Sequence, residues 1–238
     1  MPNISYVCKG EGEVILFLHG WGQNKEMMLP LIEELEQKYK CVILDLPGFG
    51  ESSYSGEKTI EEYVINLRTF LENNDLLPKC IVGHSFGGKL AALYYLKYRD
   101  IDKLIIISSP LLKPKRTIKY YLKVCLYKLK KKLKLNINSS GSEDYKNCKN
   151  EMKHFFVNVV NTHLDKQVEN ILIPTLLIWG DKDDKVPLNK GKRLKQKIRN
   201  SSLYVQKGGH FAYLENIQFT KLIIQQFLRR NKGVWINN

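Results

Sequence analysis

The sequence predicts an α/β fold: a mainly parallel central sheet with helices on both faces, interrupted by a helical insertion. Short apolar runs alternate with stretches of helical periodicity, as they do in repeated strand–helix–strand units. A Gly-x-Ser-x-Gly motif centred on Ser85 stands between one such run and a helical stretch. The alternation then stops over residues 110–173 and resumes afterwards, which indicates an insertion between sheet strands.

The expected strands are apolar runs of the kind that a parallel sheet buries on both faces. They lie at 14–18, 41–45, 80–82, 104–108, 174–179 and 203–205. The expected helices lie at 25–39, from 59 onward, at 89–96 and at 217–229. In the first of these, Asn24 is the candidate N-cap and the apolar side chains of Met28, Leu31 and Leu35 share one face.

The insertion is expected to be helical throughout. Its first part carries apolar residues at spacings of four and three, typical of an amphipathic helix: Ile118, Leu122, Cys125, Leu129 and Leu133. Four lysines fall on the opposite side, namely Lys119, Lys123, Lys130 and Lys134. A second helix is expected over about 144–164, with an apolar face made of Met152, Phe155, Phe156 and Val159. We therefore expect a core of residues 1–109 and 174–238 and a cap of residues 110–173.

Length and composition favour one cytoplasmic domain with this insertion. The chain has 238 residues, and no apolar run reaches the roughly 20 residues that a membrane-spanning helix needs. The first residues lack a basic start followed by an apolar stretch, so we expect no secretory leader. Five cysteines are scattered without metal-ligand spacing, which favours free thiols in a reducing compartment and no metal or cofactor.

Positive charge is concentrated in the insertion. The net charge is +14, and ten lysines and arginines lie between Lys113 and Lys134 without one acidic residue. This predicts an anionic partner: an anionic substrate, an acidic acyl-carrier protein or a membrane surface. The alternative is a solvated, lysine-rich helix. Nucleic acid is not expected, because no nucleic-acid-binding motif accompanies the charge.

The Gly-x-Ser-x-Gly motif has the surroundings of a nucleophile elbow. Ser85 follows an apolar run and precedes a helix, so the turn between them must be tight. Such a turn exposes the serine hydroxyl and leaves no room for a Cβ at Gly83 or Gly87. A chance motif in a loop is the alternative, and the flanking strand and helix argue against it.

A serine nucleophile needs a base, and in this kind of fold the base comes late in the chain, after the acid. His210 lies between the last expected strand and the last expected helix, in the right place for it. His84 adjoins the serine on a sharp turn and should point away from it. His19 lies in the first loop and should shape it, while His154 and His163 belong to the insertion.

Three aspartates follow the strand at 174–179 and are candidates for the acid. They are Asp181, Asp183 and Asp184, all between the serine and the histidine in the chain. A charged turn is the alternative interpretation. Charge alone does not decide among the three.

These motifs together resemble the α/β-hydrolases of the broad esterase group. The matching segments run in the family's order and are 19–22, 45–52, 83–88, 179–187 and 209–215. The family pattern Trp-Gly-x-x-Asp-x-x-x-Pro implies that Asp183 is the catalytic acid, with Asp184 as the runner-up and Asp181 at a variable position. A serine at position 85 sets the chain apart from the dehalogenases and epoxide hydrolases of the same fold, which carry aspartate there.

The resemblance also implies a mechanism. Ser85 would attack a carbonyl, His210 would carry the proton and Asp183 would orient the imidazole. The backbone N–H groups of Trp21 and Phe86 would bind the oxyanion, and the insertion would cover the serine as a cap. The expected substrate is a carboxylic ester or thioester with a small or medium acyl group. Two alternatives remain: cleavage of a carbon–carbon bond by the same triad, and a receptor that uses the pocket to bind a small molecule.

Overall fold

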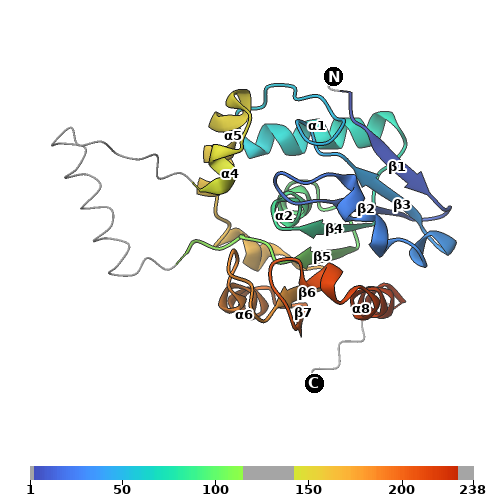
Figure 1. The fold of residues 1–238 in the computed structure, drawn as a ribbon. Helices are drawn as coiled ribbons and strands as arrows, with labels where there is room; N and C mark the ends of the chain where they lie inside the picture. Colours follow the sequence, from blue (N-terminus) through green and yellow to red (C-terminus); the bar gives the residue numbers. More distant parts are fainter. Residues whose placement is uncertain (1–2, 115–141, 230–238) are drawn as a thin grey trace, which may run out of the picture.

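The computed structural model describes residues 3–114 and 142–229, which form a seven-stranded sheet flanked by helices (Figure 1). The strands are β1 (Tyr6–Lys9), β2 (Val14–Leu18), β3 (Lys40–Leu44), β4 (Cys80–His84), β5 (Lys103–Ile107), β6 (Thr175–Gly180) and β7 (Ser201–Gln206). Their order in the sheet is β1-β3-β2-β4-β5-β6-β7. β1 pairs antiparallel with β3, and every other pairing is parallel. The predicted α/β class and mainly parallel sheet are confirmed.

Helices cover both faces of the sheet, as expected. The α-helices of the described residues are α1 (Ile60–Asn73), α2 (Phe86–Tyr98), α4 (Glu143–Lys146), α5 (Lys153–Asn161), α6 (Leu188–Lys197), α7 (Ala212–Glu215) and α8 (Ile217–Arg229). The apolar side chains of α1, α2 and α6 share one buried cluster with the side chains of one sheet face. The opposite face packs against α8 and against the segment between β2 and β3. The carboxyl ends of the parallel strands meet at one edge of this sandwich, where ligands bind in open α/β sheets.

The prediction of a helix over residues 25–39 is wrong. The segment instead forms three short 3₁₀ turns, Lys25–Met27, Leu29–Leu31 and Leu35–Gln37. Pro30 lies in the middle of it, and proline has no N–H to donate and collides with the preceding turn of an α-helix. The side chain of Asn24 makes no capping hydrogen bond. The apolar residues on the predicted face are buried all the same, because the segment lies against the sheet.

The second helix predicted in the insertion is broken into pieces. α4 ends at Lys146, a 3₁₀ turn follows over Asn150–Met152, and α5 begins only at Lys153; a further turn spans Gln167–Asn170. Its predicted apolar face is nevertheless buried. α5 lies beside α1, next to the amino-terminal end of that helix (Figure 1). The amphipathic helix predicted over 118–134, with its lysines, lies outside the described residues.

The described residues were also compared with the expectations for membrane-spanning helices and for the cysteines. In the described ranges, 3–114 and 142–229, we find no helix with the length and apolar character needed to cross a membrane. The thiols of Cys8, Cys41, Cys80 and Cys148 are free. Cys125 lies outside the described residues.

Candidate active site

Ser85 occupies the sharp turn between β4 and α2. Its backbone has φ 50° and ψ −109°, in a region that residues with a Cβ rarely adopt. Its N–H donates to the carbonyl oxygen of Ile107, at the end of the neighbouring strand β5, at 2.8 Å. The strained turn is therefore anchored to the sheet, and the serine lies at the carboxyl edge, where its side chain lines a cavity.

The two glycines of the motif are required by close backbone approach. A Cβ on Gly83 would lie 2.4 Å from the carbonyl carbon of Gly87, across the turn. A Cβ on Gly87 would lie 2.2 Å from the carbonyl oxygen of Leu18, in β2. Real Cβ atoms do not approach the backbone this closely. The first turn of α2 can therefore pack directly against the sheet only if both positions are glycine.

His210 and Asp183 form a buried pair on the loops that follow β7 and β6. His210 Nδ1 donates to Asp183 Oδ2 at 2.9 Å and lies 3.1 Å from Oδ1. Asp183 Oδ1 also accepts the backbone N–H groups of Lys185 at 3.1 Å and Val186 at 2.8 Å. Burial acts to raise the pKa of Asp183, but the hydrogen bonds from His210 and Val186 outweigh it and hold the pKa below its ordinary value. The resulting carboxylate fixes the imidazole with its proton on Nδ1, leaving Nε2 as a base.

The two neighbouring aspartates occupy other positions. Asp181 is exposed, and its Oδ1 accepts the backbone N–H of Gly208 at 2.9 Å, which ties the two loops together. Asp184 is exposed to solvent. Of the three sequence candidates, Asp183 is therefore the one whose carboxylate contacts the imidazole of His210.

His84 lies beneath His210 rather than in the cavity. The two rings have centroids 4.8 Å apart, and His84 Nε2 lies 3.0 Å from the carbonyl oxygen of His210, to which it donates. Burial lowers the pKa of His84 to about 3, so it stays neutral. No hydrogen bond joins Ser85 Oγ to His210 in residues 3–114 and 142–229; such bonds often shorten only when substrate is bound. His84 instead connects the serine turn to the histidine loop through its own side chain.

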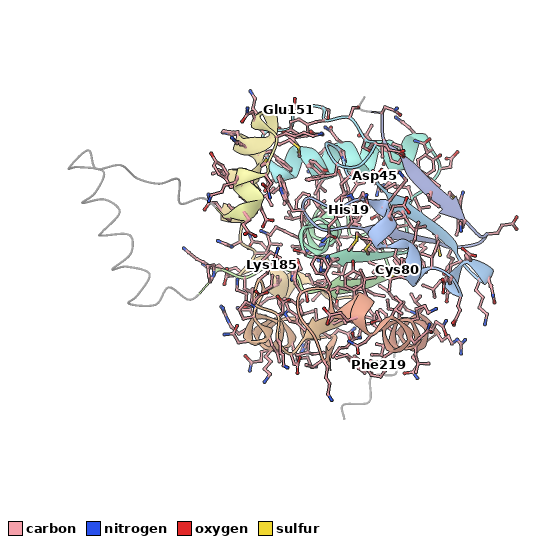
Figure 2. The ribbon with its side chains drawn as sticks, in the orientation of Figure 1. His19, Asp45, Cys80, Glu151, Lys185 and Phe219 are labelled. Atoms are coloured by element: carbon pink, nitrogen blue, oxygen red, sulfur yellow. The ribbon has the colours of Figure 1, made fainter. Side chains whose placement is uncertain are left out.

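His19 shapes the first loop, as predicted. It is fully buried inside the molecule (Figure 2), with Nδ1 donating to the carbonyl oxygen of Gly20 at 2.7 Å and Nε2 accepting the N–H of Leu46 at 3.0 Å. A hydrogen bond from the backbone N–H of Gln23 to the carbonyl oxygen of Gly20 closes a turn in this loop. Trp21 sits within this turn, next to the nucleophile.

The two predicted oxyanion donors both lie beside the serine. Phe86 is the first residue of α2, where an N–H has no partner within the helix. Within the described ranges, no acceptor is bonded to the backbone N–H of Phe86 or of Trp21. The rings of the two residues are in contact, with centroids 5.4 Å apart. Two backbone donors are thus available near Ser85, although their catalytic use stays a prediction.

A cavity of about 220 Å³ opens next to Ser85. Trp21 and Phe86 line it on the core side, and Phe156 and Val159 of α5 line it from the insertion. The ring of Trp21 contacts that of Phe156, with centroids 4.8 Å apart. The described part of the insertion therefore supplies an apolar wall over the serine, large enough for a small acyl group.

The chain is similar to proteins of known family and structure. A family model described as alpha/beta hydrolase fold matches residues 13–124, which include the first loop and the elbow. The chain has the α/β-hydrolase fold. The crystal structure of a bromoperoxidase from Bacillus anthracis superposes with a TM-score of 0.77, at 23% identity and over 95% of both chains, which supports the fold.

Two curated relatives match this hydrolase over most of their lengths. The AB hydrolase superfamily protein YisY of Bacillus subtilis is 26% identical over 249 aligned positions, which cover 92% of each chain. The pimeloyl-[acyl-carrier protein] methyl ester esterase of Aeromonas hydrophila is 23% identical over 256 positions, which cover 95% of this chain and 99% of the relative.

Sequence reasoning gave no role to several residues that shape the site of this hydrolase. Lys89, one turn after the nucleophile, is buried and lines the cavity. Ser109 donates its hydroxyl to the carbonyl oxygen of Ser85 at 2.6 Å. The spacing of four between Ser85 and Lys89 places both on one side of α2, and that signal was available in the sequence. As for metals, the described ranges hold no group of three or more His, Cys, Asp and Glu side chains placed to bind one.

Proposed function

We propose that this chain is a serine hydrolase that cleaves a carboxylic ester or thioester with a small or medium acyl group. The observation that supports it best is the arrangement at the carboxyl edge of the sheet. A serine on a strained elbow lies at the same edge as a buried His210–Asp183 pair, and His84 links their two loops. The available N–H groups of Trp21 and Phe86 complete what acyl transfer requires.

The proposed reaction proceeds through an acyl-enzyme. Ser85 Oγ attacks the carbonyl carbon while its proton passes to His210 Nε2, and the carbonyl oxygen becomes an oxyanion. The N–H groups of Trp21 and Phe86 donate to this oxyanion. The tetrahedral intermediate collapses, and the leaving alcohol or thiol departs with the proton held by His210.

Water then repeats the sequence. His210 removes a proton from a water molecule, which attacks the acyl carbon, and the second tetrahedral intermediate releases the carboxylic acid. His210 returns the proton to Ser85 Oγ. Throughout, the Asp183 carboxylate stabilises the imidazolium that forms twice in each cycle.

An acyl-carrier protein is the proposed macromolecular partner. The relative from Aeromonas hydrophila is named as an esterase of an acyl-carrier protein ester, and its whole length aligns with this chain. The ten basic residues between Lys113 and Lys134 offer charge that complements an acidic carrier. Most of that segment lies outside the described residues, so this proposal rests on the sequence and on the relative's name.

The test is turnover of p-nitrophenyl esters combined with active-site labelling. We expect wild type to hydrolyse acetate or butyrate esters and Ser85→Ala to lose at least about 10³-fold in kcat, because the nucleophile is gone. A fluorophosphonate probe should attach to Ser85, as located by peptide mass spectrometry. Labelling that persists in Ser85→Ala would refute the assignment. Tight binding of esters without turnover would favour the receptor alternative, and cleavage of a vinylogous diketone but no ester would favour carbon–carbon hydrolysis.

A further inference from the structure

Lys89 is a buried lysine that the proposed mechanism does not use. It lies one turn after Ser85 in α2, and its backbone N–H donates to the carbonyl oxygen of Ser85 at 3.3 Å. Only 2% of its surface is exposed, and it lines the same cavity as the serine. A rise of 1.5 Å per residue separates the two Cα atoms by about 6 Å along the helix. An ammonium group is therefore built into the pocket, a short distance beyond the nucleophile.

The partners of the Lys89 ammonium are neutral. Nζ donates to the carbonyl oxygens of Val159 at 2.7 Å and Thr162 at 2.9 Å, at the carboxyl end of α5. An ammonium has three N–H bonds, and no acceptor for the third is found in the described ranges. No carboxylate pairs with it there either. A buried charge without a counter-ion is costly, so an anion that entered this cavity would be stabilised.

Two further polar groups lie at this end of the cavity. Lys190, on α6, and His163, just after α5, both line it. Burial and the charge of Lys190 lower the pKa of Lys89 to about 8. Burial and the charge of Lys89 lower the pKa of His163, whose Nδ1 is buried and has no hydrogen-bond partner in the described ranges. Lys89, Lys190 and His163 are therefore close enough to influence one another electrostatically.

The nearby carboxylates do not neutralise this cluster. Asp165 pairs with Arg193 at 3.5 Å and accepts the backbone N–H of Lys113 at 2.9 Å. Asp144 lines the cavity but is itself exposed to solvent. At this end of the cavity Lys89 is buried, while His163 and Lys190 are half-buried.

We propose that Lys89, Lys190 and His163 form a carboxylate-binding site at the end of the Ser85 cavity, so that the preferred ester substrate carries a carboxylate. The inference rests on the proposed ester hydrolysis at Ser85. The apolar walls supplied by Leu112 and Phe156 would hold the methylene chain between the ester and the carboxylate. The carboxylate belongs either to the acyl part or to the alcohol part of the ester.

The test compares charged and neutral esters of matched shape. One pair, monomethyl adipate and methyl hexanoate, carries the carboxylate on the acyl side; the other, acetoxybutanoate and butyl acetate, carries it on the alcohol side. We expect kcat/KM to favour the charged member of one pair by about tenfold or more, the factor that one charge-assisted hydrogen bond supplies. The pair that shows the preference identifies the side. Equal values, or a preference for the neutral ester in both pairs, would overturn the proposal.

Substitutions then show which residues cause the preference for the charged ester. Lys190→Gln should reduce the ratio of charged to neutral kcat/KM severalfold, and Lys89→Met should reduce it further. Lys192→Gln, on the same helix but exposed and outside the cavity lining, should leave the ratio as it is. The ratio is the readout because a partly misfolded cap slows both esters alike. A ratio that survives both Lys89→Met and Lys190→Gln would assign the preference elsewhere.

Binding of the product separates this inference from the proposed reaction. Calorimetry of wild type with adipate should show binding that hexanoate does not match and that Lys190→Gln weakens. Hydrolysis of neutral esters without any carboxylate preference would refute the inference and leave the proposed function standing. If neither ester were cleaved, the proposed function would fail, and adipate binding would still decide for or against the carboxylate site.

Discussion

Ser85 keeps a strained backbone because its neighbours hold both of its peptide groups. Its N–H donates to the carbonyl oxygen of Ile107, and its own carbonyl oxygen accepts the Ser109 hydroxyl at 2.6 Å. A residue in this region of φ and ψ costs on the order of 1–3 kcal/mol and persists only where the surroundings fix it. Both bonds come from the end of β5 or just after it. The position of the nucleophile thus depends on the adjacent strand as much as on the motif.

The role of Asp183 predicts the outcome of three substitutions. Asp183→Asn should lower kcat on a p-nitrophenyl ester by on the order of 10³–10⁴, because an amide favours the wrong imidazole tautomer and does not stabilise the imidazolium. Asp184→Asn should change kcat less than about threefold, since that side chain is exposed and does not contact His210. Steady-state kinetics at one pH checks this.

Asp181→Asn is the more demanding control. Its carboxylate holds the loop that carries the histidine, through the N–H of Gly208, but an amide oxygen can accept the same hydrogen bond. We expect a loss well below that of Asp183→Asn. A larger loss at Asp184 than at Asp183 would contradict the assigned register.

Individual residues of the site were predictable to different degrees. The family pattern points to Asp183, and the structure puts that carboxylate in contact with His210. The burial of Lys89 was not predictable from the sequence, because a lysine on a helix is usually exposed and only the position of α5 covers it. Ser109 was missed for a similar reason: its partner, Ser85, is distant in the chain and is met only when β5 pairs with β4.

At the scale of whole elements, α5 is attached to its neighbours by polar contacts near its carboxyl end. The side chain of Asn158 accepts the backbone N–H of Ile60 at 2.9 Å, at the start of α1. Lys89 donates to the carbonyl oxygens of Val159 and Thr162, at the same end of α5. About one turn earlier in α5, the ring of Phe155 stacks on that of Tyr63, with centroids 4.9 Å apart. The wall of the cavity therefore has its own polar attachments in addition to apolar packing.

This attachment predicts a difference between two asparagines of α5. Asn158→Ala should lower the free energy of unfolding by about 1–3 kcal/mol, because it leaves a helix N–H near a buried residue without an acceptor. Asn161→Ala should change it by less than about 0.5 kcal/mol, since Asn161 is exposed and bonds only within its own helix. Chemical denaturation measures both.

Hydrogen exchange adds the location of the effect. Amides of α5 should exchange faster in Asn158→Ala, while those of β4 and β5 keep their protection. An equal effect of the two alanine variants on α5 would show that the Asn158 bond does not attach the helix.

Elements were predicted well where periodicity and packing agree. The buried strands and α8 follow their apolar patterns, and α1 begins at the Thr59–Glu62 capping box. β1 was missed because it lies at the sheet edge, where a short, mostly exposed strand has no clear pattern of buried residues. The segment 25–39 has helical periodicity, but Pro30 and its place against the sheet divide it into 3₁₀ turns.

Over the whole molecule, positive charge occurs in two settings that should respond differently to salt. In the cavity cluster Lys89 is buried and Lys190 is half-buried, and buried charges are screened little by ions. Four lysines of the insertion are expected, from the sequence, to lie on the polar side of an amphipathic helix, facing solvent: Lys119, Lys123, Lys130 and Lys134. Solvent-facing charges act mainly on the rate of encounter with a charged partner, and salt weakens them.

This difference in salt response allows a test of the proposed carrier. Four cap lysines are changed together to glutamine: Lys119, Lys123, Lys130 and Lys134. We expect kcat/KM on an acyl-carrier-linked ester, relative to that on a neutral p-nitrophenyl ester, to fall about tenfold at low salt. The deficit should shrink at high salt, as the Debye length drops from about 8 Å at 0.15 M to about 3 Å at 1 M.

A control variant removes the same charge from four exposed lysines outside the insertion: Lys9, Lys38, Lys97 and Lys192. If the control lowers the ratio as much as the cap variant does, overall charge attracts the carrier and the cap has no special part in it. If neither variant changes the ratio at any salt concentration, the cap lysines are only a solvated surface.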